Sequence, residues 1–348
     1  MSLPIPLDYE PMEAESALQI PSGDDWQYEP KWDGFRALCF RDGDLVQIHS
    51  KAGQPLGRYF PEMIEELRGI GADRFVLDGE LVVAVEGKPA FNALLQRIHP
   101  AESRIRKLAK ETPAQLIVFD LLVDADGNSL IEKTLTERRK ALLHFASEYL
   151  KGHTAIRVSP ATPDLDAARR WLVEMAGGLD GIIAKRTDLP YGSGERHAML
   201  KIKNLRSADC VVGGFRYGQK NRLVGSLLLG LYDTAGLLHH VGFSSAIPAA
   251  EKPDLTRKLE ALREPPGFTG NAPGGPSRWS TERSTQWEPL RPELVVEVQY
   301  DHFTGGRFRH GTKVLRWRPD KRPDQCRMEQ VEKDSRSPLD LLSGVGRS

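Results

Sequence analysis

Cysteine is scarce in this chain, and long apolar runs are missing. The 348 residues contain three cysteines, Cys39, Cys210 and Cys326, which are odd in number and far apart. This spacing fits neither a disulfide framework nor a zinc cluster, so we expect three half-buried thiols in a reducing cytoplasm. No apolar stretch approaches the ~18 residues of a membrane span, and residues 1–4 do not begin a signal peptide.

The chain also has no excess of charge of either sign. It holds 48 Lys and Arg against 48 Asp and Glu, which taken alone argues against a nucleic-acid partner. The charges are unevenly placed, however, since residues 1–204 carry 26 basic and 31 acidic residues, and residues 205–348 carry 22 and 17. A basic second half suits contact with phosphates, although simple scatter gives the same small asymmetry.

The length suits two domains rather than one core. Helix and strand patterns alternate irregularly up to residue 203, whereas short strands with one helix at Pro253–Leu262 follow the joint at 204–207. We therefore expect an α+β protein with a first domain over 1–204 and a small antiparallel barrel over 205–330. Residues 331–348 are polar, with several Gly and Ser, and predict a flexible tail.

A lysine lies among acidic neighbours in the segment Glu29-Pro30-Lys31-Trp32-Asp33-Gly34-Phe35-Arg36. The strand that begins at Trp26 delivers this lysine, and Gly34 allows the backbone to turn sharply behind it. Taken alone, the segment is also explained as a surface strand that ends in a turn. A lysine attacks as a nucleophile only when neutral, and nearby cations such as Arg36, Lys201 and Lys203, together with a metal, would lower its pKa.

Carboxylates on two other strands predict a metal site. Asp78 and Glu80 lie two apart in the strand Phe75–Val83 and so share one face, and Asp180 precedes a β-branched strand. Paired carboxylates on an apolar strand are costly unless they bind a cation or a metal, and a structural salt bridge is the competing explanation. We expect Glu80 and Asp180 to hold Mg²⁺ beside a phosphate.

Further strands supply candidate groups for a nucleotide. Lys201 and Lys203 share a face of the strand Met199–Lys203, and although paired lysines are mostly exposed, here they suit phosphate. Phe119 and Ile183 are placed to sandwich a purine. Together these groups describe attack of a lysine on the α-phosphate of a nucleotide, without a Walker loop, which the sequence lacks. Arg138, Arg139 and Lys140 fit the solvated face of an amphipathic helix over Thr136–Leu150.

The ordered series of motifs resembles the covalent nucleotidyltransferases, specifically the ATP-dependent DNA ligases. The resemblance covers residues 20–325. Its motifs are Lys31-Trp32-Asp33-Gly34, Ser50-Lys51, Leu77-Asp78-Gly79-Glu80, Val118-Phe119-Asp120, Asp180-Gly181-Ile182-Ile183, Leu200-Lys201-Ile202-Lys203 and Arg316-Trp317-Arg318-Pro319-Asp320-Lys321. Two positions depart from the family pattern, because Lys51 stands where the family has Arg and Asp180 where it has Glu.

The resemblance implies an ATP-grasp-like nucleotidyltransferase domain followed by an OB-fold β-barrel domain. It implies three steps, in which Lys31 attacks ATP and releases pyrophosphate, AMP moves to a 5′-phosphate at a nick, and the 3′-hydroxyl displaces AMP. Carried over by position, Lys31, Asp33, Lys201 and Lys203 are catalytic and Glu80 and Asp180 bind metal. The implied nucleotide contacts are Glu29 to adenine, Arg36 to ribose or the nick phosphate, Glu80 to the sugar, Ser50, Lys51, Phe119 and Ile183 around the nucleotide, Lys201 and Lys203 to phosphate, and Arg318 and Lys321 to the leaving pyrophosphate.

The co-substrate implied is ATP, with AMP covalently attached to Lys31 and Mg²⁺ or Mn²⁺ as the metal. The plan most resembles the small stand-alone bacterial repair ligases or the ligase module of the bacterial end-joining enzyme. The implied setting is a cytoplasmic monomer that acts on nicked DNA in the bacterial nucleoid, with a separate primase-polymerase as repair partner. The alternatives are an RNA-capping guanylyltransferase, an RNA ligase, and a DNA-binding module with an inactive transferase.

Overall fold

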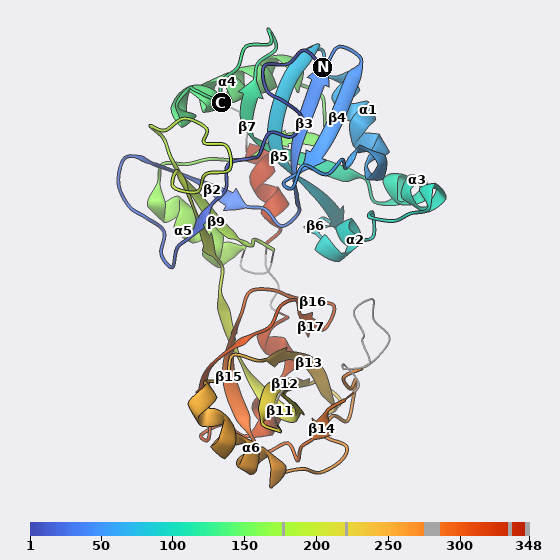
Figure 1. Cartoon of the computed structure of the whole chain (residues 1–348), viewed down its shortest axis with the longest axis vertical. Helices are drawn as coiled ribbons and strands as arrows, with labels where there is room; N and C mark the ends of the chain where they lie inside the picture. Colours follow the sequence, from blue (N-terminus) through green and yellow to red (C-terminus); the bar gives the residue numbers. More distant parts are fainter. Residues whose placement is uncertain (176–177, 220–221, 275–285, 333–335, 345–348) are drawn as a thin grey trace. The chain divides into compact units, whose positions relative to one another are not determined.

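The computed structural model describes residues 1–175, 178–219, 222–274, 286–332 and 336–344 (Figure 1). Contacts divide the chain into two compact units, which are Met1–Asn204 with Ser335–Ser348 and Leu205–Asp334. The chain thus leaves the first unit once and returns to it at its end. The sequence pattern also predicts a helix over Leu165–Ala176, and the last residue of that range lies outside the described residues.

Two sheets form the first unit. The four-stranded sheet has the order β1-β10-β9-β2, and the six-stranded sheet has the order β4-β3-β5-β7-β8, with β6 paired to β5. Neighbouring strands are antiparallel except in the pairs β1 with β10 and β7 with β8. The strands are β1 (Glu15–Ser16), β2 (Trp26–Lys31), β3 (Phe35–Asp42), β4 (Leu45–Ser50), β5 (Arg74–Val85), β6 (Lys88–Pro89), β7 (Ala114–Val123), β8 (Ile156–Val158), β9 (Gly181–Arg186) and β10 (Met199–Lys203).

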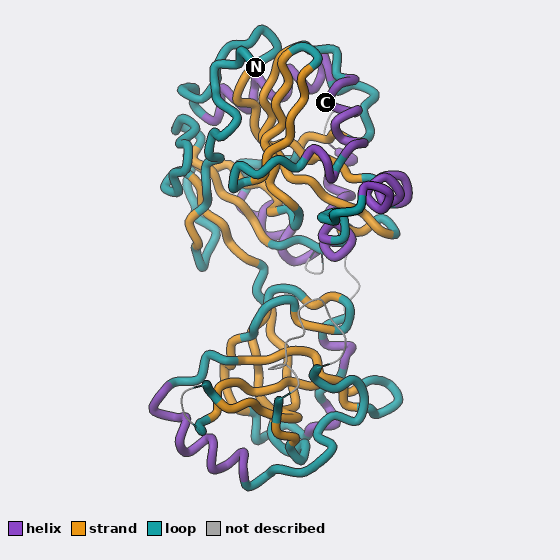
Figure 2. The backbone as a smooth tube through the Cα atoms, turned by 45° about the vertical axis from the view of Figure 1, so that its right-hand side comes forward, coloured by secondary structure: helices purple, strands orange, loops and turns teal. Residues whose placement is uncertain are grey.

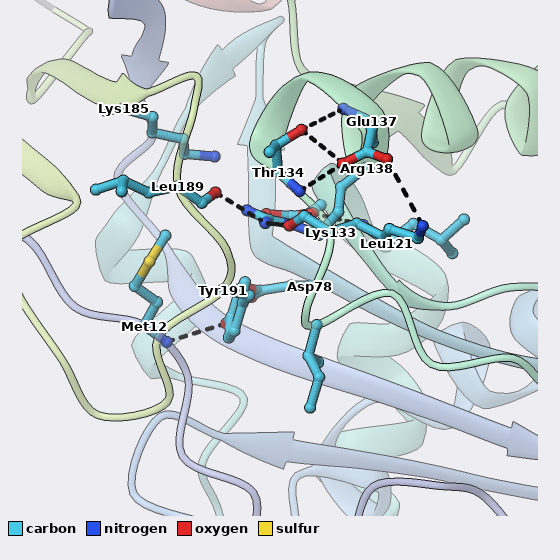
Figure 3. A network of polar contacts seen from close by, with 12 residues as sticks. Met12, Asp78, Leu121, Lys133, Thr134, Glu137, Arg138, Lys185, Leu189 and Tyr191 are labelled. Atoms are coloured by element: carbon cyan, nitrogen blue, oxygen red, sulfur yellow. Dashed lines mark hydrogen bonds and ion pairs between the residues drawn. The ribbon is translucent and has the colours of Figure 1, made fainter. Parts of the chain in front are cut away.

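Helices cover the sheets of this unit. They are η1 (Gly57–Tyr59), α1 (Pro61–Gly69), α2 (Phe91–Leu95), α3 (Glu102–Glu111), α4 (Leu135–Tyr149) and α5 (Leu165–Glu174). Apolar side chains of α1 and α4 join those of the six-stranded sheet in one buried cluster, whereas α5 packs on β2 and β9. Helix α4 begins with a capping box, in which Thr134 and Glu137 satisfy each other's backbone N–H groups (Figure 3).

One face of α4 differs from the prediction. Arg138 is buried and not solvated, since it donates from Nε and Nη2 to the carboxylate of Asp120 at 2.9 and 3.0 Å. The sequence pattern missed this pair because the carboxylate comes from β7, and a charge run on a helix is usually exposed. The pair ties the helix to the strand that carries Phe119.

The second unit is built mainly from short strands (Figure 2). Its main sheet has the order β13-β12-β11-β15-β18, with β14 paired to β11, and β16 and β17 form a separate hairpin. The elements are β11 (Arg206–Tyr217), β12 (Val224–Tyr232), β13 (Leu238–Ser244), η2 (Ala249–Glu251), α6 (Lys252–Glu260), β14 (Glu288–Pro289), β15 (Val295–Tyr300), β16 (Phe303–Thr304), β17 (Arg307–Phe308), β18 (Lys313–Trp317), η3 (Pro323–Gln325) and η4 (Met328–Gln330).

The expected β-barrel is open in this unit. Within the described ranges, the ladders make an open path, and a single bridge between Ser244 and Thr312 connects the two ends of that path. Strand β11 pairs with both β12 and β15, and their inward side chains form a buried apolar cluster that includes Phe215. The three cysteines are buried, free thiols, so they are more deeply covered than the sequence predicted.

The prediction of a flexible tail over 331–348 does not hold for the described residues 331–332 and 336–344, and its residues 333–335 and 345–348 lie outside the described residues. Val331 is buried in the second unit, and Pro338–Gly344 forms a short 3₁₀ helix, η5. In η5, Leu342 is 3% exposed and packs in a cluster with Trp32 and Ile117 of the first unit. Arg157 donates to the backbone carbonyl of Leu342 at 2.9 Å, so this segment is held by both apolar and polar contacts.

Among the residues that the structure describes, no helix combines the length and the apolar character needed to cross a bilayer.

A buried histidine makes the second unit sensitive to acid. Burial, with Arg307 and Arg216 nearby, lowers the pKa of His240 to about 3. Arg307 donates to Nδ1 at 2.8 Å, so the imidazole acts as an acceptor and stays neutral. Between about pH 3 and 6.5, the His240 imidazole is therefore protonated in the unfolded chain and neutral in the folded unit.

We expect the free energy of unfolding to fall as the pH drops below about 6.5, by up to ~1.4 kcal/mol per pH unit from this group. His240→Gln should reduce this slope between pH 4 and 6.5 in urea unfolding experiments, whatever its effect on stability at pH 8. His310→Gln, an exposed histidine of the same unit, is the control. An unchanged slope in His240→Gln would contradict the assignment.

Candidate functional site

A cavity of about 240 Å³ lies between the two sheets of the first unit. Strands β2, β9 and β10 line it from one sheet, strands β3, β5 and β7 line it from the other, and residues 11–14 complete the wall. The lining residues are Pro11, Met12, Glu13, Ala14, Glu29, Pro30, Lys31, Trp32, Arg36, Lys51, Glu80, Phe119, Ile183, Lys185, Met199 and Lys201. The structure thus brings together eight predicted residues, namely Glu29, Lys31, Arg36, Lys51, Glu80, Phe119, Ile183 and Lys201.

Strand pairing positions the expected nucleophile. Strand β2 pairs with β9 so that Lys31 lies opposite Gly181 and Glu29 opposite Ile183. Lys31 Nζ forms an ion pair with Oδ2 of Asp180, the residue that precedes β9. Gly181 has φ +154°, and a Cβ there would lie 2.0 Å from the carbonyl oxygen of Ile202. Only glycine allows the strands to approach so closely beside the lysine.

A second glycine permits close approach on the other side of Lys31. A Cβ on Gly34 would lie 2.2 Å from the carbonyl oxygen of Leu81 and 2.9 Å from Cγ of Glu80. The turn after Lys31 can therefore lie directly on β5. This contact brings the carboxylate of Glu80 to the lysine, which the strand pattern alone did not indicate.

Carboxylates dominate the pKa of Lys31, whereas the sequence led us to expect that cations and a metal lower it. Burial lowers this pKa, but Asp180, Glu80 and Asp33 outweigh burial and raise it above its ordinary value. The carboxylate of Asp180, which forms an ion pair with Nζ, outweighs the cations that were expected to dominate this pKa. Repulsion between cations instead affects Lys201, whose pKa is lowered by burial and by the nearby charges of Lys51 and Lys31.

Arg36, which lines the cavity, forms an ion pair with a buried carboxylate. Arg36 donates from Nε and Nη2 to the two carboxylate oxygens of Asp78 at 2.5 and 2.6 Å, and Asp78 is fully buried. Tyr191 donates its hydroxyl proton to Asp78 at 2.6 Å and accepts from the backbone N–H of Met12 at 3.0 Å (Figure 3). One carboxylate therefore fixes a cation of β3, an aromatic ring and the N-terminal segment.

Glu80 is the second acidic residue of β5 in this region, and it lines the cavity. Burial raises the pKa of Glu80 to about 7, although Lys31 and Arg36 pull it down. In the described part of the chain, no three His, Cys, Asp or Glu residues are grouped as metal ligands. Two carboxylates still suit Mg²⁺, which commonly takes one or two protein carboxylates and completes its shell with phosphate and water.

Cations cover the ring of Phe119. Arg36 lies 4.5 Å and the ammonium of Lys185 lies 4.7 Å from the ring centroid. Lys185 also lies 2.8 Å from Oε2 of Glu29, and Gln27 donates to Oε1 of the same carboxylate at 2.8 Å. Glu29 and Lys185 are both buried.

The remaining predicted residues of the first unit are distributed around the cavity. Lys51 forms an ion pair with Glu13 at 2.7 Å at the cavity wall. Four predicted residues are not among those that line the cavity, namely Asp33, Ser50, Asp180 and Lys203. Asp180 reaches the cavity through its ion pair with Lys31, Ser50 accepts from the backbone of Gln54, and Lys203 is exposed at the end of β10. Residue type and order alone did not separate these four residues from those that line the cavity.

Arg318 and Lys321 belong to the second unit. Asp209 on β11 accepts from both cations, from Arg318 Nη1 at 2.9 Å and from Lys321 Nζ at 2.6 Å. Asp320 accepts from Nη2 of Arg318 at 2.8 Å, and this guanidinium lowers the pKa of Asp320 to about 2. The two cations of the last motif are therefore side by side on a common carboxylate.

Sequence reasoning missed several residues of the cavity. Met12 and Glu13 carried no signal in the sequence, because their role depends on contacts with Tyr191, Lys51 and Arg196 far along the chain. Lys185 carried a signal that was available, since it lies two residues after Ile183 and so shares its face of β9.

Comparison with protein families finds two matches. Residues 10–203 match the model for the ATP dependent DNA ligase domain, and residues 220–321 match the model for the ATP dependent DNA ligase C terminal region. The first match alone covers more than half of the chain.

Individual proteins agree with the family models. The chain is 43% identical to DNA ligase C of Mycobacterium tuberculosis, over 99% of this chain and all of that protein. It is 31% identical to the multifunctional non-homologous end joining protein LigD of Mycobacterium bovis, over 86% of this chain and 37% of that protein. A solved structure of a Lig E DNA ligase, 16% identical, has a TM-score of 0.52 and covers 88% of this chain and 99% of its own, which shows a shared fold.

The Asp78 carboxylate should be required for stability. Asp78→Ala leaves the half-buried Arg36 without its partner, so we expect a loss of about 3–5 kcal/mol in the free energy of unfolding. Urea unfolding followed by circular dichroism measures this loss. Asp188→Ala, which removes an exposed partner of Arg186, is the matched control and should cost under about 1 kcal/mol. Equal effects of the two variants would rule out the anchoring role of Asp78.

Proposed function

This chain belongs to the ATP-dependent DNA ligases, and we propose that it seals nicked DNA through an AMP adduct on Lys31. The observation that carries this proposal is the cavity itself, which joins Lys31 to Glu29, Phe119 and Lys201 between two sheets. An amine nucleophile, an aromatic ring and a phosphate-binding cation are the groups that transfer of AMP from ATP needs.

In the first step, we propose, Lys31 Nζ attacks the α-phosphorus of ATP. A P–N bond forms, and the bond from the α-phosphorus to the oxygen of pyrophosphate breaks. Lys31 is an ammonium beside Asp180, so it must first lose a proton. Asp180 forms an ion pair with Nζ, so its carboxylate is placed to accept this proton and to hold the amine in position until the proton is transferred.

Mg²⁺ or Mn²⁺ fits the acidic end of the cavity. Glu80 and Asp180 would hold the ion there. Burial raises the pKa of Glu80 to about 7 and so disfavours its negative charge, and a bound metal ion would stabilise that charge. Once bound, the ion supplies charge neutralisation on the phosphates.

The later steps use a nicked duplex. AMP passes from Lys31 to the 5′-phosphate of the nick, and the 3′-hydroxyl then displaces it. The resemblance to stand-alone repair ligases supports a role in DNA repair. A primase-polymerase partner, a monomeric state and activity in the bacterial nucleoid stay predictions.

The alternatives weighed from the sequence are less well supported. The similar proteins are named DNA ligases, which does not favour an RNA-capping guanylyltransferase or an RNA ligase. An inactive transferase would need a missing nucleophile, whereas Lys31 is present and lines the cavity.

Covalent labelling tests the nucleophile. Incubation with α-³²P-ATP followed by a denaturing gel should label the wild type, and GTP should label it far less. Lys31→Ala should lose the label, because it removes the amine that lines the cavity and forms the ion pair with Asp180. Lys31→Arg should also fail, since a guanidinium stays protonated. Lys151→Ala, an exposed lysine outside the cavity, is the control, and label on Lys31→Ala would refute the assignment.

The cations of the second unit should act in one step only. We propose that Arg318 and Lys321 stabilise charge on the leaving pyrophosphate, a contribution made only in the first transition state. Arg318→Ala and Lys321→Ala should therefore slow self-labelling by roughly 10²-fold or more. Sealing of a nick that already carries 5′-AMP, measured in single turnover without ATP, should stay near wild type. Equal loss of both reactions in Arg318→Ala would contradict the proposal.

A further inference from the structure

Glu13 is a carboxylate of the cavity wall that belongs to none of the sequence motifs. It lies in the segment of residues 11–14, which lines the cavity together with Lys51 and Lys201. Lys51 Nζ lies 2.7 Å from Oε1 of Glu13, and Arg196 lies 2.8 Å (Nε) and 2.7 Å (Nη2) from Oε2. The side chains of Lys51 and Arg196 are 57% and 66% exposed. One acidic side chain therefore joins two exposed cations that are far apart in the sequence.

The backbone on both sides of Glu13 is fixed. The N–H of Met12 donates to the hydroxyl of Tyr191 at 3.0 Å (Figure 3). The N–H of Glu13 donates to the carbonyl of Glu195 at 2.8 Å. Strand β1 follows directly and pairs with β10, the strand of Lys201. Main-chain contacts thus keep the carboxylate at the cavity wall independently of its ion pairs.

The cations near Glu13 repel one another. The pKa of Lys201 is lowered, first by burial and then by the charges of Lys51, Lys31 and Arg196. Glu13 acts on this pKa in the opposite direction. The hydrogen bond with Lys51 in turn lowers the pKa of Glu13, so the carboxylate is an anion at neutral pH. A negative charge is therefore favoured at this place, whichever molecule supplies it.

A structural role alone accounts poorly for this arrangement. Ion pairs between exposed side chains contribute little to the stability of a fold, so these contacts cost little to break. Phosphate oxygens form the same charge-assisted hydrogen bonds with lysine and arginine as a carboxylate does. The triphosphate of ATP would bring several such oxygens into the cavity that Glu13 and Lys51 line. The pair contacts of Glu13 thus suit a site where one anion replaces another.

We propose that Glu13 is a positioning residue that holds Lys51 and Arg196 at the cavity wall while no phosphate is bound, yields them to the triphosphate of ATP, and recovers them as pyrophosphate leaves. This inference rests on the proposed function. Exchange of one anion for another keeps the cations of the wall paired at each stage. It also promotes the departure of pyrophosphate, because the carboxylate competes for the cations that would otherwise retain it.

Removal of the charge tests the exchange. Glu13→Gln keeps the shape of the side chain but leaves both cations free for phosphate. Adduct formation on the full-length protein is followed by intact-protein mass spectrometry with ATP and Mg²⁺. The ATP concentration for half-maximal rate should fall roughly 3- to 10-fold, the range expected when a competing ion pair is lost. The inhibition constant of adenosine, which has no phosphate, should keep its wild-type value.

The reverse reaction tests the recovery of the cations. Protein that carries AMP on Lys31 is treated with pyrophosphate and Mg²⁺. An oxygen of pyrophosphate attacks the phosphorus of the adduct, the P–N bond breaks, ATP forms and Lys31 regains its amine and a proton. The pyrophosphate concentration for half-maximal loss of the adduct should also fall roughly 3- to 10-fold in Glu13→Gln.

Glu10→Gln is the matched control. Glu10 is exposed, lies three residues before Glu13 and does not line the cavity, and its substitution changes the net charge by the same amount. This variant should leave the constants for ATP, pyrophosphate and adenosine at their wild-type values.

Each outcome decides the question. An unchanged or raised constant for ATP or for pyrophosphate in Glu13→Gln, or an equal fall in Glu10→Gln, overturns the role of Glu13. An equal fall in the constant for adenosine does so too, because it would indicate a change in the shape of the cavity rather than in its charge. A wild type that forms no adduct with ATP overturns the proposed function instead, so the two failures are distinguishable.

Discussion

The pairing of β2 with β9 in a single register is the constraint on which the cavity depends. This register places Lys31 opposite Gly181 and next to Asp180, and it places Glu29 beside Ile183 and Lys185. Side chains alternate between the faces of a strand, so a slip of one residue would turn Lys31 and Glu29 to the opposite side. The glycine at 181 permits the register, because any side chain there would collide with β10.

Charge compensation is the second theme of the site. Lys31 meets Asp180, Arg36 meets Asp78, Lys185 meets Glu29, and in the second unit Arg318 and Lys321 meet Asp209. A cavity that binds a polyanion needs cations, and cations near an apolar core are tolerated only with a counter-charge. A triphosphate bound in this cavity would therefore compete with carboxylates of the protein for the same cations.

Much of the site could be predicted from the sequence because its motifs are local. Lys31, Glu80, Phe119 and Lys201 each belong to a short pattern whose residue types state a chemical role. The partners of these residues could not be predicted, since ion pairs such as Arg138 with Asp120 depend on which strands and helices become neighbours. The pKa of Lys31 was misjudged for the same reason, because a difference of a few ångströms decides whether a carboxylate or a cation dominates. The open sheet of the second unit likewise depends on how its strands curve and end.

The last described residues add a consequence for synthesis. Leu342 packs in the apolar cluster that contains Trp32, so part of this cluster is encoded some three hundred residues after Trp32. The whole second unit is, in effect, an insertion within the first. A chain emerging from the ribosome folds its N-terminal parts first. Here the first unit cannot complete its packing until residues 336–344 have been translated, and until then the apolar surface of Trp32, Val82 and Ile117 that η5 covers stays open to solvent.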